Sequence, residues 1–378
     1  MGDNLPSSSA IDQYGLSSQQ SLCLQATLGQ GDAARSAWRA WRSKANFDQL
    51  EPDVFPLLPL LSANLQQLGV TDPWLELCKG IHRRTWYKNQ LIFKQVSALL
   101  AAFQAAGIDT LLLKDVPVAL LYYREPGLRP VNTLNLLTPV TQLSAATELL
   151  RTQGWLPKPT RRHLFTQQDF MAHSTQKFVQ SDGLVCILHW SALPQNCAPA
   201  LATVPITVNG RTTQTLSPSE QLLDLCVAGI GRPNPTVGLQ WIPDALMVLQ
   251  TAASAIDWAH LLQQATRQAL NLTLSQALTY LHTTFDAAIP SVVLQQLAQA
   301  PVQRFEQQEA WAYRHWSTWG KAQAFGAGYQ RYKWLLQQAG AVDATLSLPQ
   351  YGKTVLALDS FWQAPFKLAQ MILARSST

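Results

Sequence analysis

Three charged side chains beside two short apolar runs occupy positions where phosphate chemistry is possible. Lys114 and Asp115 directly follow the first run, and Arg129 precedes the second. A lysine can contact a phosphate as a point charge, and an arginine can clamp one through two parallel hydrogen bonds. Each residue also has a structural interpretation. Lys114 can pair with Asp115, Asp115 can cap a following helix, and Arg129 can hold the turn at Pro126 and Gly127.

The histidines and cysteines show no metal-binding spacing. His163 and His173 are ten residues apart, a distance that matches no zinc signature, and His189 beside Trp190 is expected to be a packed core pair. The five cysteines form no C-x-x-C pair, so we expect reduced thiols. The chain also has no G-x-S-x-G, P-loop, G-x-G-x-x-G or H-E-x-x-H motif, which leaves hydrolase, NTPase, Rossmann and zincin functions unsupported.

The elements that would position these side chains follow from apolar spacing and turn signals. Helical spacing dominates residues 31–106 and 217–378, and residues 1–30 are predicted to be a disordered leader. Between them, residues 107–216 alternate strands with helices. The strands are expected at 108–113, 131–138 and 184–190, the helices at 115–124 and 141–153, and a hairpin at 206–215 around Asn209-Gly210. The layout predicts an α+β core flanked by helical segments.

Composition excludes several classes of protein. Of the 378 residues, 47% are hydrophobic, which excludes global disorder, and only 13% are charged. A net charge of +5 is well below that of a dedicated nucleic-acid binder. No apolar run approaches the ~18 residues of a membrane span, and the N-terminus has no apolar signal region. We therefore expect a cytoplasmic protein.

Several motifs in order carry a family resemblance. They are AGIDTLLLK at 106–114, Tyr122, PGLRP at 126–130, NLL at 135–137 and ILHW at 187–190. This series, which covers roughly residues 60–290, resembles the uncharacterised bacterial nucleotidyltransferase family of the polymerase-β-like nucleotidyltransferase superfamily. The resemblance implies a small mixed-sheet nucleotidyltransferase-like core. It also implies a D-x-D pair on one strand and a third carboxylate on a neighbouring strand, which together hold two divalent cations.

The sequence departs from that family at each position that binds metal. Thr133 and Asn135 stand where the D-x-D carboxylates are expected, and Ile187 stands at the third carboxylate position. Asp115 replaces the glycine that lets phosphates approach a helix N-terminus. These changes predict that the standard two-metal reaction is lost. The leading hypothesis is therefore a pseudoenzyme, a binding or accessory protein for which no cofactor is expected.

Two alternatives remain open. The first is an active nucleotidyltransferase that uses Mg²⁺ and a nucleoside triphosphate in a rearranged site built from Lys114, Asp115 and Asn135, with Lys114, Asp115 and Arg129 as nucleotide-binding candidates. The second is a nucleic-acid-binding module in the C-terminal third, where bases and aromatics interleave around Arg331, Lys333 and Trp334. Aromatics at helical spacing are more often core. The expected partner is thus a nucleotide or a protein, with nucleic acid as a further candidate.

Overall fold

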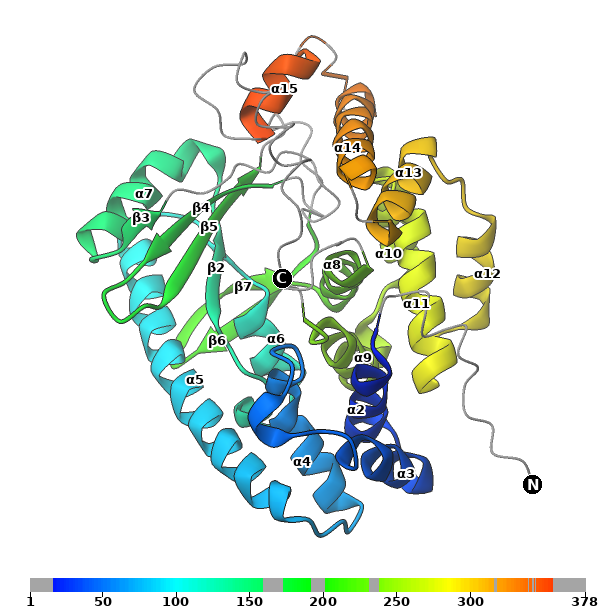
Figure 1. Cartoon of the computed structure of the whole chain (residues 1–378). Helices are drawn as coiled ribbons and strands as arrows, with labels where there is room; N and C mark the ends of the chain where they lie inside the picture. Colours follow the sequence, from blue (N-terminus) through cyan, green and yellow to red (C-terminus); the bar gives the residue numbers. More distant parts are fainter. Residues whose placement is uncertain are drawn as a thin grey trace.

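The structure is a computed structural model that describes residues 16–158, 173–191, 201–230, 238–315, 318–338, 340–341, 343 and 345–355. The predictions for His163 and for residues 1–15 of the leader lie outside these ranges. Figure 1 shows a sheet with the long helix α5 along one side and a body of shorter helices on the other.

The helices alternate with strands only in the middle of the chain. The α-helices are α2 (Ser18–Leu28), α3 (Gly31–Arg42), α4 (Leu58–Gln67), α5 (Pro73–Ala105), α6 (Asp115–Leu121), α7 (Leu143–Thr152), α8 (Pro218–Ile230), α9 (Trp241–Thr251), α10 (Trp258–Arg267), α11 (Asn271–Phe285), α12 (Ser291–Gln299), α13 (Arg304–Arg314), α14 (Thr318–Gln338) and α15 (Leu348–Val355). The strands are β1 (Leu111–Leu113), β2 (Thr133–Leu137), β3 (Leu156–Lys158), β4 (His173–Val179), β5 (Val185–Ser191), β6 (Thr203–Val208) and β7 (Arg211–Leu216).

The strands form one mixed sheet in the order β3-β4-β5-β2-β1-β7-β6. Strand β2 runs parallel to β5, and β1 runs parallel to β7, while the other neighbours are antiparallel. The predicted α+β fold with a mixed-sheet core and helical flanks is confirmed. The predicted hairpin is confirmed as β6 and β7, where Asn209 and Gly210 take φ angles of 44° and 79°, as a tight two-residue turn requires.

Two separate cores pack against the sheet. Side chains alternate across a strand, so Leu112 and its neighbour Leu113 join different clusters. Leu112 packs with the second half of α5 and with α7, whereas Leu113 packs with α6 and the shorter helices. The second cluster combines residues of the N-terminal helices, such as Trp41, with residues of α8 to α11, such as Leu278. The two predicted helical flanks therefore share one core.

The predicted domain boundary at 106/107 does not separate two packing units. Helix α5 ends there, yet its buried residues, such as Ile92, Phe93 and Phe103, belong to the core of the sheet that follows. A long amphipathic helix can cover a sheet that lies later in the sequence, and local spacing does not reveal such a contact. Strands β3 and β4 were not predicted, because β4 (HSTQKFV) has too few apolar residues to show an alternating pattern.

The predicted disordered leader is wrong for its second half. Ser18–Leu28 forms helix α2, and Cys23 and Leu24 are fully buried. A capping box starts this helix, because the Ser17 hydroxyl accepts from the Gln20 backbone at 3.1 Å and the Gln20 side chain accepts from the Ser17 backbone at 2.9 Å. The serine-rich composition hid this signal, in which a serine precedes a glutamine by three residues.

Candidate functional site

The three positions where the family resemblance implies carboxylates converge at the centre of the sheet. Thr133 and Asn135 are two residues apart on β2 and so lie on the same face. Ile187 on β5 is the direct register partner of Asn135. The geometry of a three-carboxylate site is therefore present, but its side chains carry no charge. Asn135 is buried, while Thr133 and Ile187 are half-buried.

The polar groups at these positions are hydrogen-bonded to one another. His189 Nε2 lies 3.0 Å from the Asn135 Oδ1 and donates when that nitrogen carries the proton. The Asn135 amide donates to Thr133 Oγ1 at 3.0 Å, and this hydroxyl donates to Asp115 Oδ2, also at 3.0 Å. His189 is thus buried, as expected of a core histidine, but its partner is Asn135. Each of these side chains, from His189 to Asp115, therefore has a hydrogen-bond partner among the described residues.

Asp115 is neither a helix cap nor a free carboxylate. It is the first residue of α6, and its Oδ2 accepts from the backbone amides of Asn132 and Thr133 at 3.4 and 3.3 Å. Its other oxygen lies 3.0 Å from the Arg129 guanidinium. The helix-cap interpretation is therefore wrong, because the N-cap position is Lys114 and the carboxylate turns toward β2.

Arg129 is buried and connects this site to helix α9. Its guanidinium binds both oxygens of Asp244, at 3.2 Å from Nε and 2.8 Å from Nη2, and donates to the Pro130 carbonyl at 2.7 Å. Tyr123 donates to Asp244 at 2.6 Å, and Gln240 lies 3.2 Å from the same oxygen. The site thus includes a buried arginine between two carboxylates.

Asn89 of α5, and not Arg129, holds the turn before β2. The Asn89 amide donates to the carbonyls of Pro126 and Arg129 at 2.6 and 2.8 Å and accepts from the Val131 backbone at 3.0 Å. The expectation that Arg129 pins this turn is wrong, since its side chain points instead to the two carboxylates. Gly127 is required there, because a β-carbon would lie 2.5 Å from the His82 ring.

Charge pairing sets the ionisation of the cluster. Burial alone would raise the pKa of Asp115, but the Arg129 charge and the hydrogen bonds from Thr133 and Asn132 outweigh it and hold that pKa below its usual range. Burial would lower the pKa of Arg129, but the two carboxylates raise it. Burial together with the Asp244 charge raises the pKa of Tyr123. Asp115 is therefore ionised at neutral pH, and it shares the Arg129 guanidinium with Asp244.

Lys114 is the cation of this site that remains available. No ion pair or hydrogen bond of its side chain is found among the described residues, and the residue is half-exposed. Its backbone has φ 60° and ψ −124°, a conformation that side chains with a β-carbon rarely adopt. The strand-to-helix connection thus places a strained lysine beside Asp115.

These residues do not fit a two-magnesium centre. Mg²⁺ prefers carboxylates and water as ligands, whereas this site offers a hydroxyl, an amide and the apolar Ile187. The Thr133 and Asn135 oxygens already have protein partners, and Asp115 is paired with Arg129. Within the described ranges, no three His, Cys, Asp or Glu side chains are grouped so that they could hold a metal ion.

The basic and aromatic residues of the C-terminal third divide between the core and the surface, where Trp319 is 73% exposed. Arg331 of α14 is 3% exposed and binds the Glu309 carboxylate at 2.6 and 3.1 Å. Trp334 packs against Phe305. Lys333 is exposed, over the Tyr329 ring. The nucleic-acid surface expected from this pattern lacks Arg331, because that guanidinium is fully engaged in the core.

Two important residues had no clear signal in the sequence. Asp244 is a single acid in the apolar run of α9, and it is 115 positions from its partner Arg129. Asn89 is a polar residue on the buried face of α5, in line with Ile92 and Phe93. A buried polar residue in an apolar stripe signals a specific hydrogen-bond partner, although it does not identify that partner.

A mixed sheet with a helix after its first strand, and with these positions on β2 and β5, defines a nucleotidyltransferase-like core. A family model described as "Uncharacterised nucleotidyltransferase" matches residues 56–286, and the chain belongs to this family. The match extends from α4 to the end of α11, so it includes Asp244 and Arg129.

Other comparisons add little detail. The chain is similar to the crystal structure of an antigenic nucleotidyltransferase-like protein from Paracoccidioides brasiliensis, with 15% identity and a TM-score of 0.32 over 54% of this chain and 96% of that one. No curated protein matches the chain. No helix in the described ranges has the length and apolar character needed to cross a membrane.

Proposed function

We propose that this protein is a non-catalytic member of its family, a pseudoenzyme that acts as a binding or accessory protein. The observation that carries the proposal is the hydrogen-bond chain from His189 through Asn135 and Thr133 to Asp115. In a catalytic site of this class, the same positions would present free carboxylates to two metal ions. Here Asn135 donates to Thr133, and Ile187 has no polar group to offer.

The cost of opening this chain supports the proposal. A metal ion that took the Asn135 oxygen would leave His189 without its acceptor, at about 1–3 kcal/mol for a buried group. A metal ion that took Asp115 would compete with the Arg129 guanidinium, which lies 3.0 Å from that carboxylate. Ligands gained at Thr133 and Asn135 carry no negative charge to offset these losses. The site therefore favours its internal hydrogen bonds and ion pair over a cation.

Nucleotide binding without turnover remains part of the proposal, with Lys114 as the candidate phosphate contact. Its ammonium has no described partner, so a phosphate could approach it without breaking an ion pair. The adjacent Asp115 carboxylate opposes that approach by like-charge repulsion. We therefore expect any triphosphate affinity to be low, and a protein partner becomes the main candidate ligand.

The alternative is an active enzyme with a rearranged site of Lys114, Asp115 and Asn135. The ionised state of Asp115 suits a metal ligand. The alternative nevertheless requires Asp115 to exchange Arg129 for Mg²⁺. It predicts that changes at Asp115 abolish activity.

A labelled-nucleotide transfer assay distinguishes the two. Purified protein is incubated with each of the four α-³²P nucleoside triphosphates, with Mg²⁺ or Mn²⁺, and with protein, RNA and small-molecule fractions as acceptors. The variants are Asp115→Ala and, as a matched control, Asp109→Asn, which changes an exposed acid at the other end of β1. We expect no metal-dependent incorporation above background with any of the three proteins.

Metal-dependent incorporation by the wild-type protein would overturn the proposal. If Asp115→Ala then lost the activity while Asp109→Asn kept it, the rearranged site would be correct. A thermal-shift panel with the same nucleotides and metals tests binding separately, since a ligand that prefers the folded state raises the melting temperature. A shift that is independent of metal and lost in Lys114→Ala would identify nucleotide binding without catalysis.

A further inference from the structure

The outward face of helix α5 carries an excess of positive charge. Its 33 residues include five lysines and arginines but a single acid, Glu76, which pairs with Lys79 at 2.6 Å. The basic residues are Lys79, Arg83, Arg84, Lys88 and Lys94. The whole chain has a net charge of +5, so this one helix supplies a charge of +4. The positive charge of the molecule is concentrated here, while the rest of the chain is nearly neutral.

Three of these cations are unpaired within the part of the chain that the structure describes. Arg83, Arg84 and Lys94 are exposed and form no ion pair or hydrogen bond with described side chains. Unlike Arg129 and Arg331, they contribute little to the folded structure. A cluster of like charges without partners also repels itself, and an anionic ligand would relieve that repulsion.

Exposed aromatic and aliphatic side chains lie among these cations. Tyr87 is 62% exposed, Trp86 46% and Leu91 47%. Arg83, Tyr87 and Leu91 follow each other at intervals of four residues, so they form one stripe along the helix. The distance from Lys79 to Lys94 is about 22 Å at 1.5 Å per residue. Cations beside exposed rings over such a length are typical of a surface that binds single strands.

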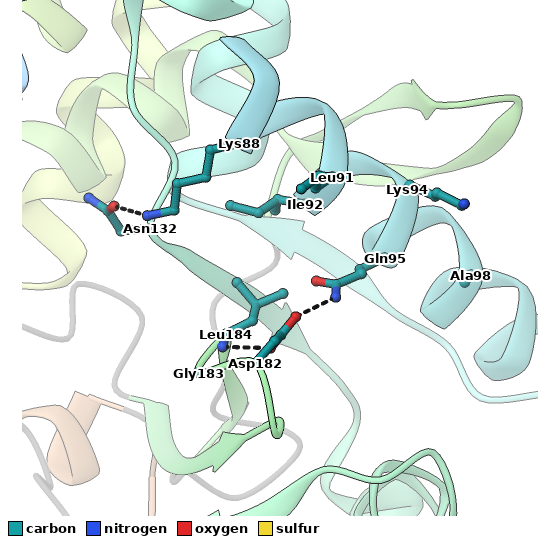
Figure 2. Close-up of a pocket in the computed structure, with 10 residues that line it drawn as sticks. All are labelled: Lys88, Leu91, Ile92, Lys94, Gln95, Ala98, Asn132, Asp182, Gly183 and Leu184. Atoms are coloured by element: carbon teal, nitrogen blue, oxygen red, sulfur yellow. Dashed lines mark hydrogen bonds between the residues drawn. The ribbon is translucent and has the colours of Figure 1, made fainter. Parts of the chain in front are cut away.

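A groove beside this face widens the surface. It has a volume of about 640 Å³ and lies between α5 and the turn that joins β4 to β5. Figure 2 shows Lys88 reaching toward Asn132, where the two side chains are 3.2 Å apart, and Gln95 donating to Asp182 at 2.8 Å. Among the residues that line it, Asp182 is the acid, and it is already held by Gln95 and by the Leu184 backbone.

The groove is next to the nucleotidyltransferase-like site. Asn132 accepts from Lys88 on one side, and its backbone amide donates to Asp115 on the other. A nucleic-acid strand that ran along α5 would therefore pass beside Asn132, which is bonded to Asp115. The basic face of α5 thus adjoins the nucleotidyltransferase-like site, which would not be expected of charges scattered at random over the surface.

We propose that the outward face of α5 and its groove bind single-stranded nucleic acid. Phosphates would contact Arg83, Arg84 and Lys94, and bases would stack on Tyr87. A membrane surface fits less well, because the apolar stripe of α5 is buried in the core and the exposed apolar side chains alternate with cations. The proposal goes beyond the loss of catalysis and does not depend on it.

The test is fluorescence anisotropy with labelled oligothymidylate and oligouridylate of about 12 nucleotides, within the ~4–16 that such surfaces cover. The full-length protein is compared with the variant R83Q/R84Q/K94Q and with Y87A. The matched control is R267Q/R304Q/R314Q, which removes three exposed positive charges from α10 and α13. Circular dichroism melts of all four proteins show whether each is folded.

We expect the wild-type protein and the control variant to bind with similar affinity. The α5 variant should bind at least tenfold more weakly. The plot of log K against log salt should also become less steep, its slope shrinking by about 2, because each phosphate contact to a single strand contributes about 0.7 to that slope. Y87A should bind at least fivefold more weakly, from the loss of one stacked base.

Three results would overturn the proposal. The first is no binding of either oligonucleotide at low salt. The second is an equal loss in the α5 variant and in the control, which would assign binding to net charge. The third is binding to phosphatidylserine vesicles with none to oligonucleotides, which would assign the face of α5 to a membrane.

Discussion

Helices α5 and α14 both carry basic residues, but Arg331 of α14 lies in the core whereas Arg83 and Arg84 of α5 face outward. Both interleave arginines and lysines with aromatic residues. In α14, Arg331 is buried against Glu309 and the carbonyls of Gln268 and Ala269. In α5, Arg83 and its neighbours face outward. A basic and aromatic pattern therefore predicts a binding surface only where the cations have no internal partner.

The nucleotidyltransferase-like site behaves like α14. Arg129 has the residue type and position of a phosphate clamp, but its guanidinium is shared between Asp115 and Asp244. Its role is to join β2 to helix α9. Consequently, the two regions with internal charge pairs should respond to substitution by losing stability, whereas the face of α5 should respond by losing a ligand.

The largest expected effect is at Arg331. Arg331→Gln should lower the free energy of unfolding by about 3–5 kcal/mol, because it leaves Glu309 buried and unpaired. Urea denaturation measures this. Lys333→Gln is the control on the same helix, and it should cost under about 1 kcal/mol, since Lys333 is exposed and its ammonium lies over the Tyr329 ring. Similar losses in both variants would contradict the assignment of Arg331 to the core.

Substitution of Arg129 should lower the free energy of unfolding by a similar amount, and its effect should depend on Asp244. Arg129→Gln should cost about 3–5 kcal/mol, because both Asp115 and Asp244 lose their counter-charge. Asp244→Asn in the same protein should recover part of that loss, since it removes one unpaired carboxylate. Additive losses in this double-mutant cycle would show that the two residues do not interact.

Lys114 should show a gain in stability. Lys114→Gly should raise the free energy of unfolding by about 1–2 kcal/mol, because glycine adopts a φ of 60° without strain. Lys114→Ala keeps the β-carbon and should bring no such gain. A loss of stability with glycine would mean that the lysine side chain makes a stabilising contact.

Acid should weaken the site through Asp115. Its pKa is lower in the folded protein than in the unfolded chain, so its contribution is fully present above the unfolded value of about 3.9 and is lost as the pH falls through the folded value. Unfolding measured from pH 6 down to pH 3 should therefore show a steeper loss for the wild-type protein than for Asp115→Asn. Parallel curves would contradict the pairing with Arg129.

The smallest effect on stability is expected at α5. R83Q/R84Q/K94Q should change the free energy of unfolding by no more than about 0.5 kcal/mol, as exposed unpaired side chains do. The same variant should lose oligonucleotide affinity. A large loss of stability would show that these cations have structural partners, and the contrast with α14 would then disappear.

Local signals predicted much of the core of the fold. The Asn209-Gly210 turn, the strand that carries Thr133 and Asn135, and the strand that carries Ile187 all follow from residues close together in the sequence. Their convergence in the sheet followed from the family resemblance. The bonds that close the site could not be predicted in this way, because Arg129 meets Asp244 across 115 positions.

Exposure was the second limit of the sequence. The helical spacing of the aromatics of α14 predicts core positions, which is confirmed for Tyr332, buried against Tyr351, and wrong for Trp319, which is 73% exposed. Nothing in that spacing distinguishes Arg331, which is buried, from Lys333, which is exposed. Helix α5 shows the converse, since its sequence shows no sign that its basic residues lie exposed on one face. That exposure follows from which face of the helix packs on the sheet.

The most direct test of the central claim is a titration of Mn²⁺ with ATP, followed by electron paramagnetic resonance, since free Mn²⁺ loses its signal on binding. With the wild-type protein, we expect the same signal as for Mn²⁺ and ATP alone, because Thr133, Asn135 and Ile187 supply no anionic ligand. A stoichiometric loss of free Mn²⁺ that disappears in Asp115→Asn but persists in Asp109→Asn would contradict it. That result would mean that the site has kept a metal through Asp115.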